Sequence, residues 1–260
     1  MKKTNLLFAM IPLLGLGLLV ACKKERLLTY DTSDNSIYYH YVGTTGVPLD
    51  TVAFTFAFSP VSVTDTIFMI PVWVTGVASK ASRAYNVVVD TGTTAVAGKD
   101  YTLPATFVFA ADSLRDSLSV HIIRTADMQT TPVFLRLKLL PSKDLNTDIK
   151  TVSDNFGDTI GVTSFKLNIS DILVAGPYWT NVFSTYFGTF SVKKVQLINQ
   201  VTGMPLNYIT IVGLYDLNFS SRISYYAISM ANYLAAQGAA GHPVYEADGV
   251  TVMTMGAAYQ

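Results

Sequence analysis

The chain has 260 residues, 50% of them hydrophobic, and its 18 Lys and Arg residues balance its 18 Asp and Glu residues to a formal net charge of zero. This length suits one large domain or two small ones. The balanced charge and the lack of any basic run exclude a protein that binds nucleic acid through a positive surface.

Residues 1–21 have the pattern of an export signal. Lys2 and Lys3 supply the positive start, residues 6–20 form an apolar stretch, and the small Ala21 precedes the expected cleavage site. A transmembrane helix is the alternative, but this stretch is about 15 residues long and a helix needs about 20 to cross a bilayer. We therefore predict that residues 1–21 are removed and take no part in the fold.

A stretch that resembles a bacterial lipobox ends this segment and consists of Leu19, Val20, Ala21 and Cys22. The resemblance implies that the Cys22 sulfur accepts a diacylglyceryl group and that residues 22–29 form a lipidated tether; stable anchoring needs two or more acyl chains. Lys23, rather than Asp, follows the cysteine, which implies the outer membrane. We expect display at the cell surface, with the periplasmic face as the alternative. Because Cys22 is the single cysteine, disulfides and cysteine nucleophiles are excluded from the folded part.

The acid types indicate turns and strands rather than helices. Glu25 and Glu246 are the only glutamates, and every other acid is Asp, which favours turns and helix caps. The 15 Tyr and 14 Phe residues, together with many Val and Thr, suit strands. The composition therefore predicts a mainly β fold.

Residues 51–58 show a clear period of two, with Val52, Phe54, Phe56 and Phe58 on one side, which predicts a half-buried strand. Residues 66–74 are apolar on both sides, as in a central strand, and Pro71 there requires a bulge or an edge position. Further strands are predicted at 36–42, 85–90, 105–110, 117–124, 133–139 and 164–170. Their spacing predicts an immunoglobulin-like β-sandwich over residues 30–172.

Residues 175–177, Ala-Gly-Pro, predict a linker. Beyond it, helical spacing of apolar residues predicts helices over 191–200 and 222–237. The second helix has a cap signal at each end, Ser221 and Gly238. We expect residues 175–260 to form a small α-rich unit, α+β in class, that packs on the sandwich.

A family resemblance is carried by stretches spread over the mature chain: 27–31, 65–67, 70–76, 94–101, 115–118, 137–141, the surroundings of Trp179 and 187–194. The chain resembles a family of Bacteroidota outer-membrane lipoproteins with a domain of unknown function, often encoded beside SusC/SusD-type nutrient-uptake genes. Residues 95–123 also resemble a Calx-β-type sandwich repeat. The resemblance implies an accessory lipoprotein associated with polymer acquisition, and it carries over no catalytic residue.

No catalytic constellation is recognisable, and we predict that the protein is not an enzyme. Glycoside hydrolysis usually needs two placed carboxylates, but Glu246 is the only Glu of the folded region, so a hydrolase built from distant Asp residues is the third-ranked alternative. Asp90 and Asp100 flank one loop, and two acids are too few for a calcium cage. The histidines lack the spacing of metal ligands and are His40, His121 and His242. We expect no metal and no cofactor.

Aromatic residues are the best candidates for ligand binding, because sugar-binding surfaces stack pyranose rings on exposed Tyr and Trp. The candidates are Tyr38, Tyr39, Tyr41, Trp73, Trp179 and Tyr186. Most aromatics of a sandwich pack in its interior. Tyr178 and Trp179, beside the linker, are our prediction of an exposed, ligand-binding pair.

These patterns predict a non-enzymatic, lipid-anchored protein of the outer membrane that assists capture and uptake of a glycan or other polymer with a SusC/SusD-type system. The alternative is a structural or adhesive surface module that binds protein partners. An exposed aromatic platform would favour the glycan, whereas a broad apolar patch would favour a protein partner.

Overall fold

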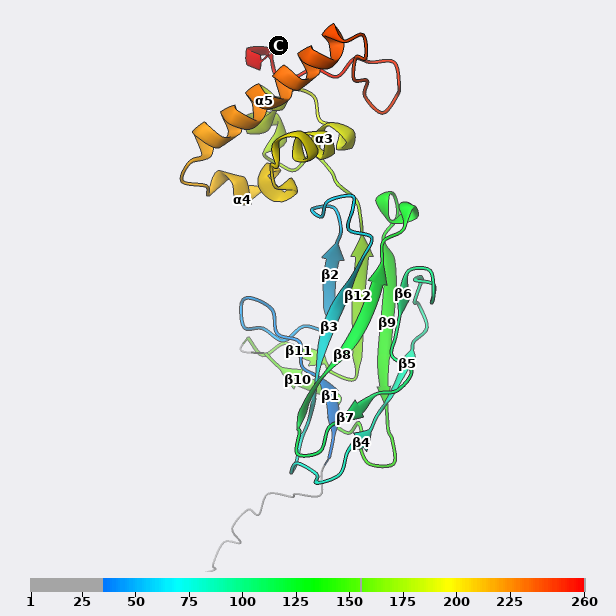
Figure 1. The fold of residues 1–260 in the computed structure, drawn as a ribbon. Coiled ribbons are helices and arrows are strands. Elements are labelled where there is room, and N and C mark those ends of the chain that lie inside the picture. The colour runs from blue at the N-terminus through cyan, green and yellow to red at the C-terminus, as the bar shows by residue number, and fades with distance from the viewer. Residues whose placement is uncertain (1–34, 155, 260) are drawn as a thin grey trace, which may run out of the picture.

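The computed structural model describes residues 35–154 and 156–259. Figure 1 shows an elongated β-sandwich with a helical unit stacked on one of its ends. The predicted fold class, a β-sandwich followed by a small helical region, is confirmed. The predicted signal segment 1–21, the lipobox with Cys22 and the tether 22–29 lie outside the described residues.

One face of the sandwich is a four-stranded antiparallel sheet with the order β1-β3-β8-β6. Its strands are β1 (Ile37–Tyr39), β3 (Asp65–Val74), β8 (Arg115–Ile123) and β6 (Tyr101–Thr102). Side chains alternate between the two faces of a strand. The inward set of the two long strands is buried and comprises Ile70, Val72, Val74, Leu118, Val120 and Ile122.

The other face is a four-stranded sheet with the order β2-β12-β9-β5. Its strands are β2 (Thr51–Thr55), β12 (Ser164–Ser170), β9 (Val133–Leu140) and β5 (Asn86–Val89). β2 runs parallel to β12, whereas the other pairs are antiparallel. Two short pairs complete the β-structure: β4 (Arg83–Ala84) with β7 (Val108–Phe109), and β10 (Thr151–Ser153) with β11 (Thr159–Gly161).

The predicted strand 51–58 is shorter than expected and ends at Thr55. A turn follows, in which the Ser59 N–H donates to the Phe56 carbonyl at 2.7 Å. Because the turn interrupts the period of two, Phe56 and Ala57 are both buried and Phe58 is exposed. The prediction that Phe58 shares the inward face is therefore wrong.

Pro71 lies one residue past the end of the ladder between β1 and β3, whose last pair is Tyr39 with Val72. The Pro71 carbonyl faces this side and accepts a hydrogen bond from the His40 N–H at 2.9 Å. The Pro71 nitrogen faces the same side but carries no hydrogen, so the reciprocal bond to the His40 carbonyl cannot form and the ladder between β1 and β3 stops here. Pro71 therefore lies where β3 has no paired strand on that side, which agrees with the edge position predicted for it.

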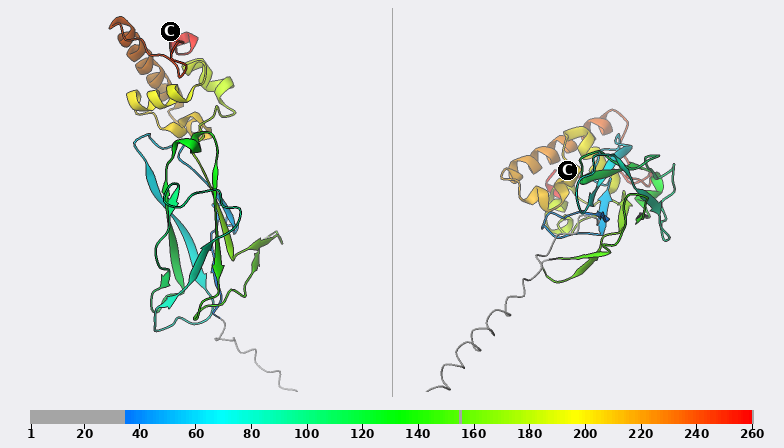
Figure 2. Two further views of the ribbon diagram at one scale, coloured as in Figure 1. Left: turned by 90° about the vertical axis from the view of Figure 1, so that its right-hand side faces the viewer. Right: turned by 90° about the horizontal axis from the view of Figure 1, so that it is seen from below.

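The helical unit contains α2 (Ser184–Phe187), α3 (Val192–Thr202), α4 (Ile211–Leu214) and α5 (Phe219–Ala239). Single turns lie at Trp179–Phe183, Leu206–Ile209 and Ala257–Tyr259, and another, Ala126–Gln129, belongs to the sandwich. α3 begins and ends with cap residues, because the Ser191 side chain accepts a hydrogen bond from Lys194 N–H and Gly203 adopts a left-handed conformation. Figure 2 shows this unit at the end of the sandwich from two further directions.

α5 extends beyond the predicted segment 222–237 at both ends. It begins at Phe219, before the predicted cap Ser221, and Gly238 lies inside it. The chain leaves the helix where Gly241 adopts the left-handed conformation at φ 79°. Within the part of the chain that the structure describes, no helix combines the length and the apolar character needed to cross a bilayer.

The sandwich and the helical unit each enclose a cluster of buried hydrophobic side chains. Ala57 and Leu173, from the end of the sandwich, belong to the helical cluster. Close to Leu173 in sequence, the Asp171 carboxylate accepts two hydrogen bonds of 2.8 Å from the Arg124 guanidinium, which also donates to the Pro60 carbonyl. This pair joins the ends of β8 and β12 where the chain leaves the sandwich.

Candidate functional site

The predicted exposed pair Tyr178 and Trp179 is not a surface platform. Trp179 is only 3% exposed, and its indole Nε1–H donates to the Gly188 carbonyl at 3.0 Å. Its ring packs edge-to-face on Phe190 with centroids 4.9 Å apart. Tyr178 is half-buried against the same cluster. The prediction for Trp179 is wrong because the chain enters a helical turn directly after the linker and directs the indole inward.

Three other aromatic candidates are also occupied by packing, whereas a fourth, Tyr38, is only partly covered. Tyr39 is buried, and burial raises the pKa of its hydroxyl. Tyr41 packs on Phe68 and Phe165, and Tyr186 stacks on Tyr259 with centroids 5.7 Å apart. Tyr38 is half-buried on β1. Tyr38 is the register partner of Trp73 and lies on the same outer face of the sheet.

Trp73 lies instead on the outer face of β3, near the end of that strand. Since Ile70, Val72 and Val74 point inward, the intervening residues point outward. Two of the outward side chains, Ile67 and Met69, are 64% and 48% exposed. The outer face of β3 therefore carries a row of apolar side chains that ends at Trp73.

Side chains from the two strands beside β3 hold the Trp73 indole in place. The His40 ring, just past β1, stacks on Trp73 with centroids 3.6 Å apart and an interplanar angle of 24°. Arg115, the first residue of β8, is the register partner of Trp73, and its guanidinium carbon lies 4.2 Å from the ring centroid. Arrangements of this kind combine stacking with cation–π attraction. Because strand register fixes Trp73 and Arg115, and a backbone hydrogen bond to Pro71 holds His40, the indole is preorganised.

These residues border an open groove of about 740 Å³, which we call the tryptophan groove. Its lining consists of His40, Val42, Met69, Pro71, Trp73, Arg115, Asp116 and Ser117. Burial, and secondly the charge of Arg115, lower the pKa of the His40 imidazole, which favours its neutral form. The groove thus combines an aromatic ring, apolar side chains and polar groups, as small-ligand sites commonly do.

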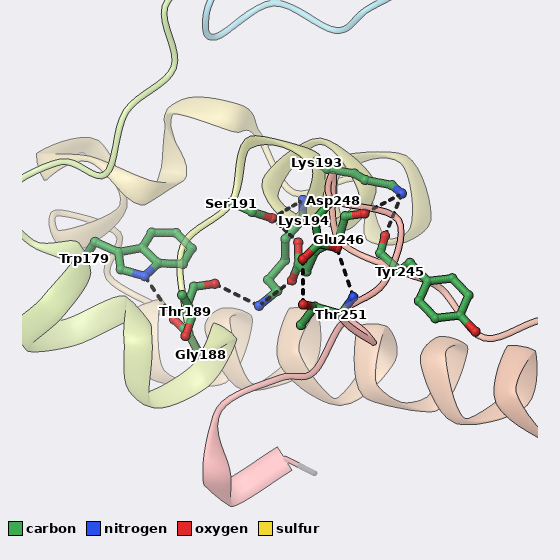
Figure 3. A network of polar contacts seen from close by, with 10 residues as sticks. All are labelled: Trp179, Gly188, Thr189, Ser191, Lys193, Lys194, Tyr245, Glu246, Asp248 and Thr251. Atoms are coloured by element: carbon green, nitrogen blue, oxygen red, sulfur yellow. Dashed lines mark hydrogen bonds and ion pairs between the residues drawn. The ribbon is translucent and has the colours of Figure 1, made fainter.

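A second polar cluster, in the helical unit, is structural. Figure 3 shows the Lys194 ammonium between the Glu246 carboxylate, at 3.3 Å, and the Thr189 carbonyl, at 2.8 Å. The Ser191 hydroxyl donates to the same carboxylate at 2.5 Å while accepting from the Lys194 N–H. Because each group already has partners and Lys194 is buried, the network secures the loop at Glu246 to α3 and leaves neither a free nucleophile nor a free acid.

The loop acids considered for calcium have local partners. Asp100 is buried, and its carboxylate accepts hydrogen bonds from the Val96 N–H at 2.8 Å and the Thr125 hydroxyl at 3.2 Å. Asp90 accepts from the Thr91 N–H. Over residues 35–154 and 156–259, no group of three or more His, Cys, Asp and Glu residues is arranged to hold a metal ion.

The histidines lie apart from one another. His40 belongs to the tryptophan groove, whereas His121 on β8 lies 3.7 Å from Asp65. His242 follows the end of α5, where its N–H donates to the Gln237 carbonyl.

The sequence did contain a sign of the groove. Residues 66–74 are apolar on both sides of the strand, and one of those sides is the solvent-facing side of the sandwich.

The family model described as "Domain of unknown function (DUF4843)" matches residues 30–204. No curated protein matches the chain. Solved structures with similarity include CBD12 from CALX1.2, at 11% identity and TM-score 0.35 over 52% of this chain and 43% of that chain. The apo-form Calx CBD1 domain has 12% identity and TM-score 0.34 over 53% of this chain and 99% of that domain's chain. A Bacteroides ovatus protein of unknown function has 12% identity and TM-score 0.37 over 54% of this chain and 46% of that chain. The chain therefore spans less than half of the CBD12 and Bacteroides ovatus chains.

Proposed function

Because the chain belongs to the DUF4843 family, whose description assigns no activity, we propose its function from its own surface. The protein is a non-enzymatic, lipid-anchored protein of the outer membrane that captures a glycan or other polymer in the tryptophan groove for uptake by a SusC/SusD-type system. The observation that carries this proposal is the half-buried Trp73, held between His40 and Arg115 in an open groove.

The groove suits a saccharide for three physical reasons. The rim of the Trp73 ring and the Met69 side chain offer apolar contact to the C–H faces of a sugar. Arg115 and Ser117 offer polar groups to its hydroxyls. The lining stands on paired strands, so little conformational entropy is lost when the ligand binds. A groove open to solvent also accepts an internal segment of a long polymer.

The lipobox at Cys22 supports the anchoring part of the proposal. β1, the first described strand, starts opposite Val74, at the end of the sandwich far from the helical unit. A lipid at Cys22 would therefore direct the helical unit away from the membrane. The groove, close to Trp73 and Arg115, would lie in the half of the sandwich nearer to the anchor.

The test is calorimetric titration of the full chain in detergent with plant, fungal and host glycans. We expect saturable heat with one polymer class, and loss of that heat in Trp73→Ala. Tyr215→Ala is the matched control, because Tyr215 is an exposed aromatic of the helical unit. No heat with any glycan, or equal loss in both variants, would contradict glycan capture in this groove.

A second function, docking of a protein partner, is favoured by a different surface. Between α4 and α5, Tyr215 and Leu217 are 79% and 101% exposed, and Ile211 and Val212 of α4 are exposed as well. Apolar side chains grouped in this way mark sites of protein contact. If the helical unit docks on a transporter component, Leu217→Asp abolishes co-purification of that component while Trp73→Ala leaves it unchanged.

A further inference from the structure

The polar side chains on the Trp73 stack have no hydrogen-bond partner among the described residues. Over the described ranges, the Arg115 guanidinium, the Trp73 indole N–H and the His40 ring make no hydrogen bond or ion pair with protein groups. A guanidinium and an indole only donate, and a carboxylate only accepts. Arg115 and the Trp73 indole therefore suit a ligand group that is rich in acceptors.

Among the described residues, Arg115 forms no ion pair with a carboxylate. Asp116 borders the groove, but the alternation of β8 turns it towards the opposite face, where it accepts a hydrogen bond from the Tyr85 hydroxyl at 3.0 Å. Asp65, the acid on the outer face of β3, is separated from Trp73 by roughly 26 Å of strand. At that separation, physiological salt screens its charge almost completely.

We propose, as a deepening of the proposed function and resting on it, that the tryptophan groove binds an acidic polysaccharide, with a uronate carboxylate held by the Arg115 guanidinium. The planar fork of arginine matches the two oxygens of a carboxylate. The stacking on Trp73 fixes the plane of that fork in advance. His40, just past the end of β1, adds a ring nitrogen that can donate to the same acidic unit or to its neighbour.

The apolar row on β3 extends this site along the strand. Pro71, Met69 and Ile67 follow Trp73 at every second residue, and Met69 and Ile67 are exposed. Successive outward residues of a strand are about 6.6 Å apart, which is comparable to the length of one sugar unit. Arg115 therefore selects the acidic unit, and the row contacts the units beside it.

The test is titration of the full chain with polygalacturonate, its fully methyl-esterified form, a neutral galactan and dextran sulfate. We expect saturable binding of polygalacturonate that weakens with salt, and at least tenfold weaker binding of the ester and the neutral polymer. Tryptophan emission gives a second readout. Trp73 and Trp179 are the two tryptophans, and Trp179 is buried, so a saturating change reports on the groove.

The variants separate a specific role of Arg115 from general charge. Arg115→Gln lowers the affinity for polygalacturonate about tenfold or more, the effect expected from loss of a charged hydrogen bond. Arg115→Lys gives an intermediate loss, because it keeps the charge but not the fork. Arg136→Gln, which removes an exposed arginine of β9 on the other sheet, leaves the affinity unchanged.

Each outcome of the panel has a definite meaning. Equal binding of the acidic and esterified polymers, or binding of a neutral glycan alone, overturns the acidic inference and leaves glycan capture standing. Binding of dextran sulfate alone overturns the assignment of a carboxylate. An absence of binding to every polymer overturns both the inference and the proposed function, and equal losses in Arg115→Gln and Arg136→Gln overturn the role of Arg115.

Discussion

At the scale of single residues, the charged groups with the deepest burial serve the fold. The Lys194 side chain is 1% exposed and has a carboxylate partner, Glu246, that is itself largely buried. Removing one member of such a pair leaves an uncompensated charge in the interior, which costs more than the pair contributes. Glu246, the first candidate for a catalytic acid by residue type, therefore stabilises the fold.

Glu246→Gln is expected to lower the free energy of unfolding by about 3 kcal/mol, because it leaves the Lys194 ammonium without a carboxylate. Lys80→Met is the control, since Lys80 pairs with Asp112 at the surface with a side chain 91% exposed and should change stability by less than about 0.5 kcal/mol. Denaturant unfolding measures both. Adding Lys194→Met to Glu246→Gln should recover part of the loss, and no recovery would argue against an uncompensated charge.

The two tryptophans show where reasoning from sequence stops at this scale. Trp179 follows a linker, and its position there predicts exposure, whereas Trp73 lies in an apolar run and is one of six aromatic candidates for ligand binding. The structure buries Trp179 and leaves Trp73 half-buried beside an open groove. Which face of a strand is covered depends on partners distant in sequence, and here the elements packed beside β3 are the strands of its own sheet, β1 and β8.

At the scale of elements, the spacing of apolar residues predicted where a strand or helix lies better than where it begins or ends. β12 has the predicted bounds, Ser164–Ser170, and β9, predicted over 133–139, buries alternate residues while Arg136 and Lys138 point outward. β2 ends early and α5 starts early, because turns made by neighbouring side chains override the periodic pattern. At the start of α5, the relevant side chain is Asp216.

Asp216 should give the start of α5 a measurable dependence on pH. The Asn218 N–H, then the Tyr208 hydroxyl and the Arg222 charge, lower the pKa of this carboxyl below its ordinary value of 3.8. A carboxyl with a lowered folded-state pKa stabilises the fold above its unfolded pKa, and this contribution is lost as the pH falls through the folded pKa. Wild type should therefore exceed Asp216→Asn in Tm at neutral pH, and the gap should close below pH 3.8. A gap independent of pH would contradict this role.

Two glycines of the helical unit should respond to alanine with opposite signs. A Cβ at Gly256 would lie 2.0 Å from the Thr185 carbonyl oxygen, so the C-terminal segment would have to move away from α2. We expect Gly256→Ala to cost about 2 kcal/mol. At Gly238, inside α5, a Cβ meets nothing within 4 Å, and alanine should stabilise by about 0.5 kcal/mol. Thermal unfolding measures both changes in stability, and a change of the same sign in both variants would contradict the packing of Gly256 on α2.

At the scale of the whole molecule, the two buried clusters meet through very few side chains. Leu173 leaves the sandwich after β12 and enters the helical cluster, and the Arg124–Asp171 pair fixes the chain immediately before it. Neither this pair nor the parallel pairing of β2 with β12 was predictable, because both join residues far apart in sequence. The contacts that position the helical unit therefore cannot be recognised from short stretches of the sequence.

Leu173→Ala should destabilise the helical unit selectively, by about 2 kcal/mol, since it removes a buried side chain from that cluster alone. Leu118→Ala, in the sandwich cluster, is the reciprocal control. Hydrogen exchange resolves the two units, and faster exchange confined to α5 in the first variant and to β3 in the second is the expected result. Uniform acceleration in either variant would show that the units unfold together.

The direction of the strands also has a mechanical consequence. β1 starts at one end of the sandwich, and β12 delivers the chain to the helical unit at the other. A pull between a membrane anchor and a partner held by the helical unit would run along the strands, across ladder hydrogen bonds that lie perpendicular to it. These bonds would be loaded in shear and would share the force, so the sandwich would transmit tension between its two ends.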